Sequence, residues 1–168
     1  RSLVGSEMCI RDRYDAIILA TSGLTRLGLT DRIRHELDTH ISLPAVGQGA
    51  LAIECRSDDA DVLALLEPLN DEPSRLCVMA ERAMNRHLQG GCQVPIAGFA
   101  TIQEGQIHLQ GRVGSVDGKT LLKAEHHNAL VDDARESEQI AEAMGVVVAE
   151  ALIAQGADKI LAQIYQDR

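Results

Sequence analysis

The chain has 168 residues, of which 45% are hydrophobic, and its 25 acidic against 16 basic side chains give a formal net charge of −9. This charge argues against a nucleic-acid binder, which needs a basic surface to displace counterions from phosphates. No apolar run approaches the roughly 20 residues that cross a bilayer, and the N-terminus lacks a secretory h-region. We therefore expect a cytoplasmic protein with a packed core that binds neither nucleic acid nor membrane.

The first thirteen residues, RSLVGSEMCIRDR, follow neither helical nor strand periodicity. We interpret residues 1–13 as a non-native leader and leave them out of the fold. The apolar run over residues 14–21 predicts a strand buried on both faces, as in a parallel sheet. Ser22 is then the predicted N-cap of a short helix that carries Arg26.

A second apolar stretch, residues 41–55, is interrupted by Pro44, Gly47 and Gly49. These breaks predict two short strands around a tight turn rather than one long strand.

From residue 58 onward the pattern is helical. Leucines and other apolar residues at spacings of three and four predict one helix over residues 58–69 and a second over 73–89. Gly90 and Gly91 stand where a left-handed residue commonly ends a helix. Cys92 is therefore predicted to lie on a loop.

Three alternating segments separated by turn residues predict an antiparallel meander over residues 94–103, 106–114 and 119–127. Two further helices are predicted over 132–155 and 157–165. The predicted fold class is an α+β C-terminal domain, a three-stranded antiparallel sheet with helices on one face. Partial α/β segments, too small to form a finished domain, precede it.

Most of the polar residues indicate no chemistry by themselves. The six histidines show neither H-x-x-x-H nor H-E-x-x-H spacing, so no metal site is expected. No Walker loop or G-x-G-x-x-G pattern is present. The four cysteines form no C-x-x-C pair, which favours reduced thiols over a zinc ribbon or a disulfide framework.

One thiol has unusual neighbours. Cys92 follows Gly90–Gly91 and stands three residues before Pro95. The glycines leave room beside the sulfur for a bulky group, and the proline stiffens the exit from the loop. A functional cysteine is one interpretation, and a small residue that fills the loop is the other. Arg82 and Arg86 could favour the thiolate, or they could be solvated helix charges.

Three segments in this order and spacing closely resemble the C-terminal half of the porphobilinogen deaminase (hydroxymethylbilane synthase) family. They are LPAVGQGA at 43–50, AERAMN at 80–85 and GGCQVPI at 90–96. The resemblance runs from residue 14 to about residue 165. It implies that Cys92 carries a dipyrromethane cofactor through a thioether. On this primer the family deaminates four porphobilinogen molecules and joins them into hydroxymethylbilane, a precursor of haem and chlorophyll.

The chemistry that the resemblance implies accounts for a cysteine and for arginines. Loss of ammonia from porphobilinogen leaves an electrophilic methylene, which a soft thiolate traps as a stable thioether. The growing pyrrole chain is polyanionic, so planar guanidinium groups should bind its carboxylates. The resemblance gives this role to Arg26, and it places the backbone of Thr21, Ser22 and Gly23 along the cofactor cleft. Gln48 is a weaker candidate.

The resemblance also implies what this chain lacks. The family's catalytic aspartate belongs to its N-terminal domain, so no catalytic residue is assigned here. Residues 14–44 would be a remnant of domain 2, 45–67 a returning segment of domain 1, and 68–168 the cofactor-attachment domain. We expect the chain to be a fragment that is inactive alone. The parent enzyme would be a monomer, whereas the fragment would tend to self-associate through uncovered apolar strands.

Two other functions stay open. A non-catalytic α+β regulatory module that binds a small ligand between its sheet and helices would leave Cys92 unmodified. A cysteine-dependent acyl transferase would need a histidine base near Cys92, and the chain order offers no obvious one.

Overall fold

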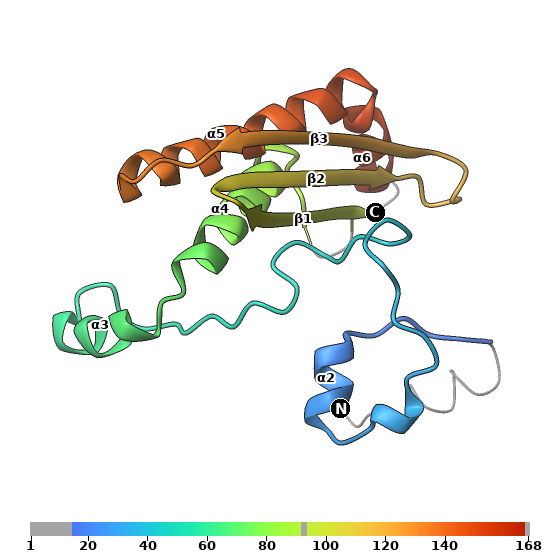
Figure 1. Cartoon of the computed structure of the whole chain (residues 1–168). Helices are drawn as coiled ribbons and strands as arrows, with labels where there is room; N and C mark the ends of the chain where they lie inside the picture. The colour runs from blue at the N-terminus through green and yellow to red at the C-terminus, as the bar shows by residue number, and fades with distance from the viewer. Residues whose placement is uncertain (1–14, 92–93, 167–168) are drawn as a thin grey trace. The chain divides into compact units, whose positions relative to one another are not determined.

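A computed structural model describes residues 15–91 and 94–166 (Figure 1). The chain divides into two compact units, residues 1–37 and residues 38–168, and each is described by itself. The predicted leader, residues 1–13, lies outside the described residues.

The first unit contains one α-helix, α2 (Thr21–Arg26), and one 3-10 turn, η1 (Thr30–Arg32), among its described residues. The predicted short helix that carries Arg26 is therefore confirmed. Its predicted cap is wrong, because the N-cap is Ala20, with no side-chain hydrogen bond, and Ser22 lies inside the helix.

The strand predicted over residues 14–21 is not formed by the described residues 15–20. Ile17, Ile18 and Leu19 are 45%, 77% and 56% exposed. A strand buried on both faces needs neighbours that pair with its backbone, and the described part of the chain has one sheet, to which this segment does not belong.

Residues 41–55 also form no strands, contrary to prediction, whereas the tight turn between them is confirmed at residues 46–49. Gly47 and Gly49 have φ angles of 70° and 87°, which glycine adopts without steric cost. The flanking chain makes loop contacts in place of strand pairing: the N–H of Gly98 donates to the carbonyl of Pro44 at 3.3 Å.

The two central helices are confirmed with slightly different limits. They are α3 (Ala60–Leu66), which continues into the 3-10 turn η2 (Glu67–Leu69), and α4 (Glu72–His87). Aspartates begin both helices. Asp59 accepts a hydrogen bond from the N–H of Val62, and Asp71 accepts one from the N–H of Ser74. These caps satisfy backbone donors that the first helical turn leaves free.

The predicted meander is confirmed as a three-stranded antiparallel sheet in the order β1 (Ile96–Gln103), β2 (Gln106–Gly114) and β3 (Leu121–Ala129). At the first hairpin Glu104 and Gly105 have φ angles of 51° and 73°, which fits a two-residue turn with positive φ at both positions.

Helices α4 and α5 (Ala134–Ala154) cover one face of this sheet (Figure 1). The last helix, α6 (Ala157–Gln166), follows α5 after Gly156. The largest fully buried side chains come from α4, α5 and β2: Met84, Ile107, Leu109, Val113, Met144, Val148 and Leu152. The α+β fold class is therefore confirmed. Among the described residues no single helix could span a membrane, and α5 and α6 meet the length and hydropathy criteria only as a pair bent by 83°.

The backbone of α5 lies close to that of α4 at Gly145. A Cβ atom there would lie 2.4 Å from the carbonyl oxygen of Ala80 and 2.7 Å from the backbone nitrogen of Met84. Both are backbone atoms, so no side-chain rotation would relieve the clash.

We expect Gly145→Ala to lower the free energy of unfolding by about 1–3 kcal/mol through overpacking. This sign opposes helix propensity, which favours Ala over Gly by about 1 kcal/mol. The exposed Val147→Ala on the same helix is the matched control and should change stability by less than about 0.5 kcal/mol. Urea denaturation measures both variants. A Gly145→Ala chain at least as stable as the parent would contradict this helix packing.

The burial pattern also predicts how proteases cut the chain. Between residues 15 and 70 the only buried hydrophobic side chain is Leu43, whereas the main core runs from Leu76 to Leu161. We expect limited proteolysis to trim the chain from its N-terminus to a resistant core that begins between Cys55 and Pro73. Mass spectrometry of the fragments measures this limit. Resistance from residue 14 onward would show instead that the first unit is stably folded.

Candidate functional site

The loop predicted to hold the functional cysteine begins where α4 ends. The N–H of Gln89 donates to the carbonyl of Arg86 at 3.0 Å, and the N–H of Gly90 donates to that of Asn85 at 2.8 Å. This pair of bonds is a Schellman helix end. The left-handed residue is Gln89, with φ 54°, and not Gly90 or Gly91 as predicted, because α4 ends at His87, two residues before the predicted end.

Gly90 lies against the Asn85 side chain. A Cβ atom at this position would lie 2.0 Å from Oδ1 of Asn85, whose side chain folds over the turn and donates from Nδ2 to the Gly90 carbonyl at 3.4 Å. Gly91 is exposed, and a Cβ atom there would meet no other atom within 4 Å. The backbone directly before Cys92 therefore adjoins open space.

Hydrogen bonds join the two ends of the loop and tie it to the last helix. The N–H of Val94 donates to the carbonyl of Gly91 at 3.3 Å. The hydroxyl of Tyr165 on α6 donates to the carbonyl of Gln89 at 2.6 Å. Cys92 itself lies outside the described residues.

The other predicted binding residues lie in both units. The structure places Thr21, Ser22, Gly23 and Arg26 on α2 in the first unit, where the Arg26 side chain is exposed. Gln48 lies in the second unit, where it is exposed in the turn at residues 46–49. Because each unit is described by itself, the structure does not bring these residues together in one site.

Cys77, on α4, is half-buried and is unsuited to nucleophilic chemistry. Burial, followed by the charges of Glu81 and Asp71, raises the pKa of Cys77 to about 11. A thiol with this pKa stays protonated at neutral pH and traps electrophiles poorly.

The two arginines that could favour a thiolate differ in their contacts. Arg86 lies 3.3 Å from a carboxylate oxygen of Glu142 on α5, so it forms an ion pair between helices. Arg82 is exposed and has no carboxylate partner among the described residues. The structure therefore favours a helix-packing role for Arg86.

Sequence reasoning missed Glu81, a buried carboxylate that joins the first two family-like segments. Glu81 is 5% exposed. One oxygen accepts from the N–H of Gly47 at 2.7 Å, and the other accepts from the N–H of Ala100 at 2.8 Å. The turn at residues 46–49 is thus fixed to α4 and to β1. The sequence offered one signal for this role: Glu81 directly follows Ala80, one of the apolar residues predicted to lie on the buried face of the helix.

Burial raises the pKa of Glu81 above its ordinary value of 4.5, and the hydrogen bonds from Gly47 and Ala100 oppose this shift without cancelling it. The folded state therefore binds the Glu81 proton more tightly than the unfolded state does. The contribution of this group to stability is complete below pH 4.5 and is lost as the pH rises through the folded pKa.

We expect Glu81→Gln to lose one of the two hydrogen bonds, because its amide NH2 faces a backbone N–H. The cost near pH 5 should be about 1–3 kcal/mol. The stability advantage of the parent chain over this variant should shrink as the pH rises, since only the parent ionises. Thermal unfolding of both chains, measured from about pH 5 upward, gives the difference in stability. The exposed Glu36→Gln is the control, and a pH-independent advantage over Glu81→Gln would contradict the assignment.

Two family models match the chain. Residues 7–64 match "Porphobilinogen deaminase, dipyromethane cofactor binding domain", and residues 75–154 match "Porphobilinogen deaminase, C-terminal domain". The first match begins within the predicted leader, whose non-native origin stays a prediction. The second covers α4, the sheet and α5. The resemblance of the three sequence segments is thus confirmed, and the chain belongs to the porphobilinogen deaminase family of hydroxymethylbilane synthases, transferases of tetrapyrrole biosynthesis.

Proposed function

We propose that Cys92 of this chain carries the dipyrromethane cofactor of a hydroxymethylbilane synthase through a thioether bond. The match to a cofactor-binding domain and a C-terminal domain of one family supports this function. The observation that carries the site is the form of the loop: α4 and Tyr165 hold the backbone before Cys92, while Gly91 adjoins open space. The described part of the loop therefore fits a bulky group on the next residue.

When bound, the dipyrromethane supplies the primer to which substrate pyrroles are added. The role of the chain is to hold that primer. Cys92 anchors it by a bond that does not hydrolyse, and the exposed guanidinium of Arg26 pairs with its carboxylates. Such pairing is needed in a protein with a net charge of −9. We place the backbone of Thr21, Ser22 and Gly23, with Gln48 as a weaker contact, along the same cleft.

We further propose that these 168 residues do not convert porphobilinogen by themselves. This rests on the resemblance, which assigns the family's catalytic aspartate to no residue of this chain. The limits of the domain remnants, 14–44, 45–67 and 68–168, belong to the same proposal.

We expect Cys92 to carry two linked pyrroles in the enzyme expressed from the reading frame extended upstream. Intact-mass and peptide mass spectrometry locate the adduct, and an aldehyde pyrrole reagent should colour the protein. Cys92→Ser should abolish the adduct and the activity, whereas Cys77→Ser should keep both because that thiol stays protonated. The 168-residue chain alone should have a free Cys92. Active enzyme with an unmodified Cys92 would rule the proposal out.

We expect Arg26→Leu in the same enzyme to slow elongation about 10- to 150-fold. This factor corresponds to the free energy of one charge-assisted hydrogen bond, about 1.5–3 kcal/mol. Its melting temperature should be unchanged, because Arg26 is exposed. Arg34→Leu, also exposed on the first unit, is the matched control and should keep full activity. Normal turnover of Arg26→Leu would remove Arg26 from the site.

A further inference from the structure

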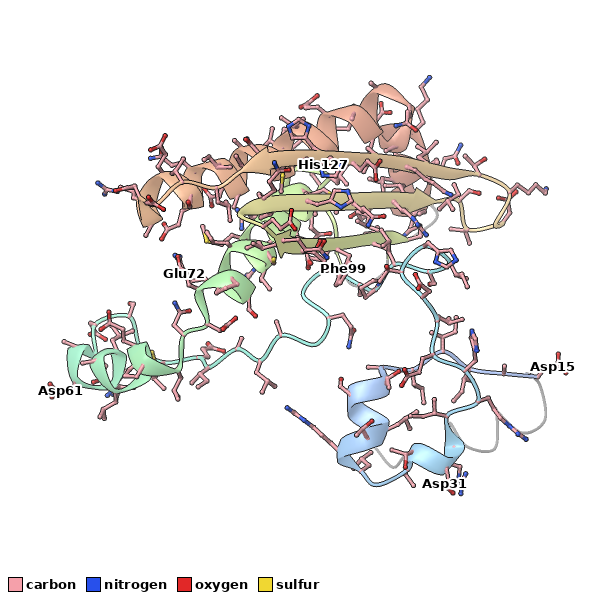
Figure 2. The ribbon with its side chains drawn as sticks, viewed as in Figure 1. Asp15, Asp31, Asp61, Glu72, Phe99 and His127 are labelled. Atoms are coloured by element: carbon pink, nitrogen blue, oxygen red, sulfur yellow. The ribbon has the colours of Figure 1, made fainter. Side chains whose placement is uncertain are left out.

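The sheet face opposite the helices carries two imidazoles and a carboxylate in contact. His108 lies on β2 directly opposite His127 on β3, and Glu125 lies two residues before His127 on the same face. The two rings stack, with centroids 3.9 Å apart and planes 9° from parallel. Nε2 of His108 lies 3.3 Å from a carboxylate oxygen of Glu125. Figure 2 labels His127 on β3.

We propose that His108, Glu125 and His127 bind a divalent cation of the zinc type. Two imidazole nitrogens and one carboxylate oxygen are a donor set that Zn²⁺ uses, and Mg²⁺ or Ca²⁺ prefers oxygen donors alone. One ligand atom from each side chain lies within 4.8 Å of the other two. Neighbouring ligand atoms around tetrahedral Zn²⁺ lie about 3.3 Å apart. Because the nitrogen lone pairs of two parallel rings point the same way, the imidazoles must turn out of their stacked arrangement to direct both nitrogens at one ion. A fourth position would stay open to water.

The backbone beneath this cluster is fixed. β2 is the central strand and pairs with β1 and β3 on its two sides. Ile107 and Leu109, the neighbours of His108, have no exposed surface and anchor the strand in the core. Binding therefore has to order side chains only, which keeps its entropic cost low.

Two basic side chains adjoin the cluster along this face of the sheet. Glu125 lies opposite Gln110, and the next pair along this face is Arg112 with Lys123. Arg112 directs its guanidinium to the backbone carbonyls of residues 39–41 at 3.2–3.4 Å. Its charge is therefore engaged by these carbonyls. The net charge of −9 favours cation binding overall.

Zinc titration of the 168-residue chain tests the proposal. Because thiols also bind Zn²⁺, the cysteines are first alkylated with iodoacetamide. Calorimetry should then show one Zn²⁺ per chain and no binding of Mg²⁺. His127→Gln and Glu125→Gln should each weaken Zn²⁺ binding about tenfold or more. His35→Gln, an exposed histidine of the first unit, is the matched control and should bind as the parent does.

Histidine ring NMR signals give a second measurement that does not depend on variants. Zn²⁺ should shift the signals of His108 and His127 and leave those of His35 in place. Circular dichroism confirms that each variant is folded. The proposal would be overturned if the alkylated parent did not bind Zn²⁺. It would also be overturned if His127→Gln and Glu125→Gln bound Zn²⁺ with the affinity of the parent. It does not rest on the proposed function, so it can fail while the cofactor assignment stands.

Discussion

The carboxylate of Glu81 is the interaction on which the arrangement around the cysteine loop depends. A buried charge is costly unless its hydrogen-bonding capacity is satisfied, and here backbone N–H groups take the place of a cationic side chain. The two donors, Gly47 and Ala100, come from segments 34 residues before and 19 residues after Glu81. Withdrawing either segment would leave part of the carboxylate unpaired. The turn at residues 46–49, α4 and β1 are therefore coupled, and α4 leads directly to Gly90.

The structure separates local from non-local determinants of this fold. The helices and the hairpins could be predicted, because apolar spacing, aspartate caps and a Glu-Gly turn act within a few residues. The strands predicted over 14–21 and 41–55 are wrong, because a local pattern alone does not decide whether a strand forms. An apolar run becomes a strand only when another strand pairs with it, and the described residues provide no such partner. The left-handed residue after α4 was missed by one position, because glycine rather than Gln89 was expected there.

The candidate site shows the same division. The segment GGCQVPI was sufficient to single out Cys92, and the family matches support the identity of its surroundings. The roles of Arg26, Thr21, Ser22, Gly23 and Gln48 stay predictions. The histidine cluster escaped a search for linear metal motifs because its members come from two strands. The alternation of side chains along a strand could have indicated the cluster. Glu125 and His127 share one face of β3, and the hairpin register brings His108 against them.

The hydrogen bond from Tyr165 to Gln89 has a consequence for the order in which the domain is completed. Its two residues are 76 positions apart, so the carbonyl at the end of α4 receives this donor only after α6 has been synthesised. During translation the cysteine loop stays without this tether while the sheet and α5 are already available to fold. The contact between the end of α4 and α6 is therefore among the last contacts of the described chain to become available.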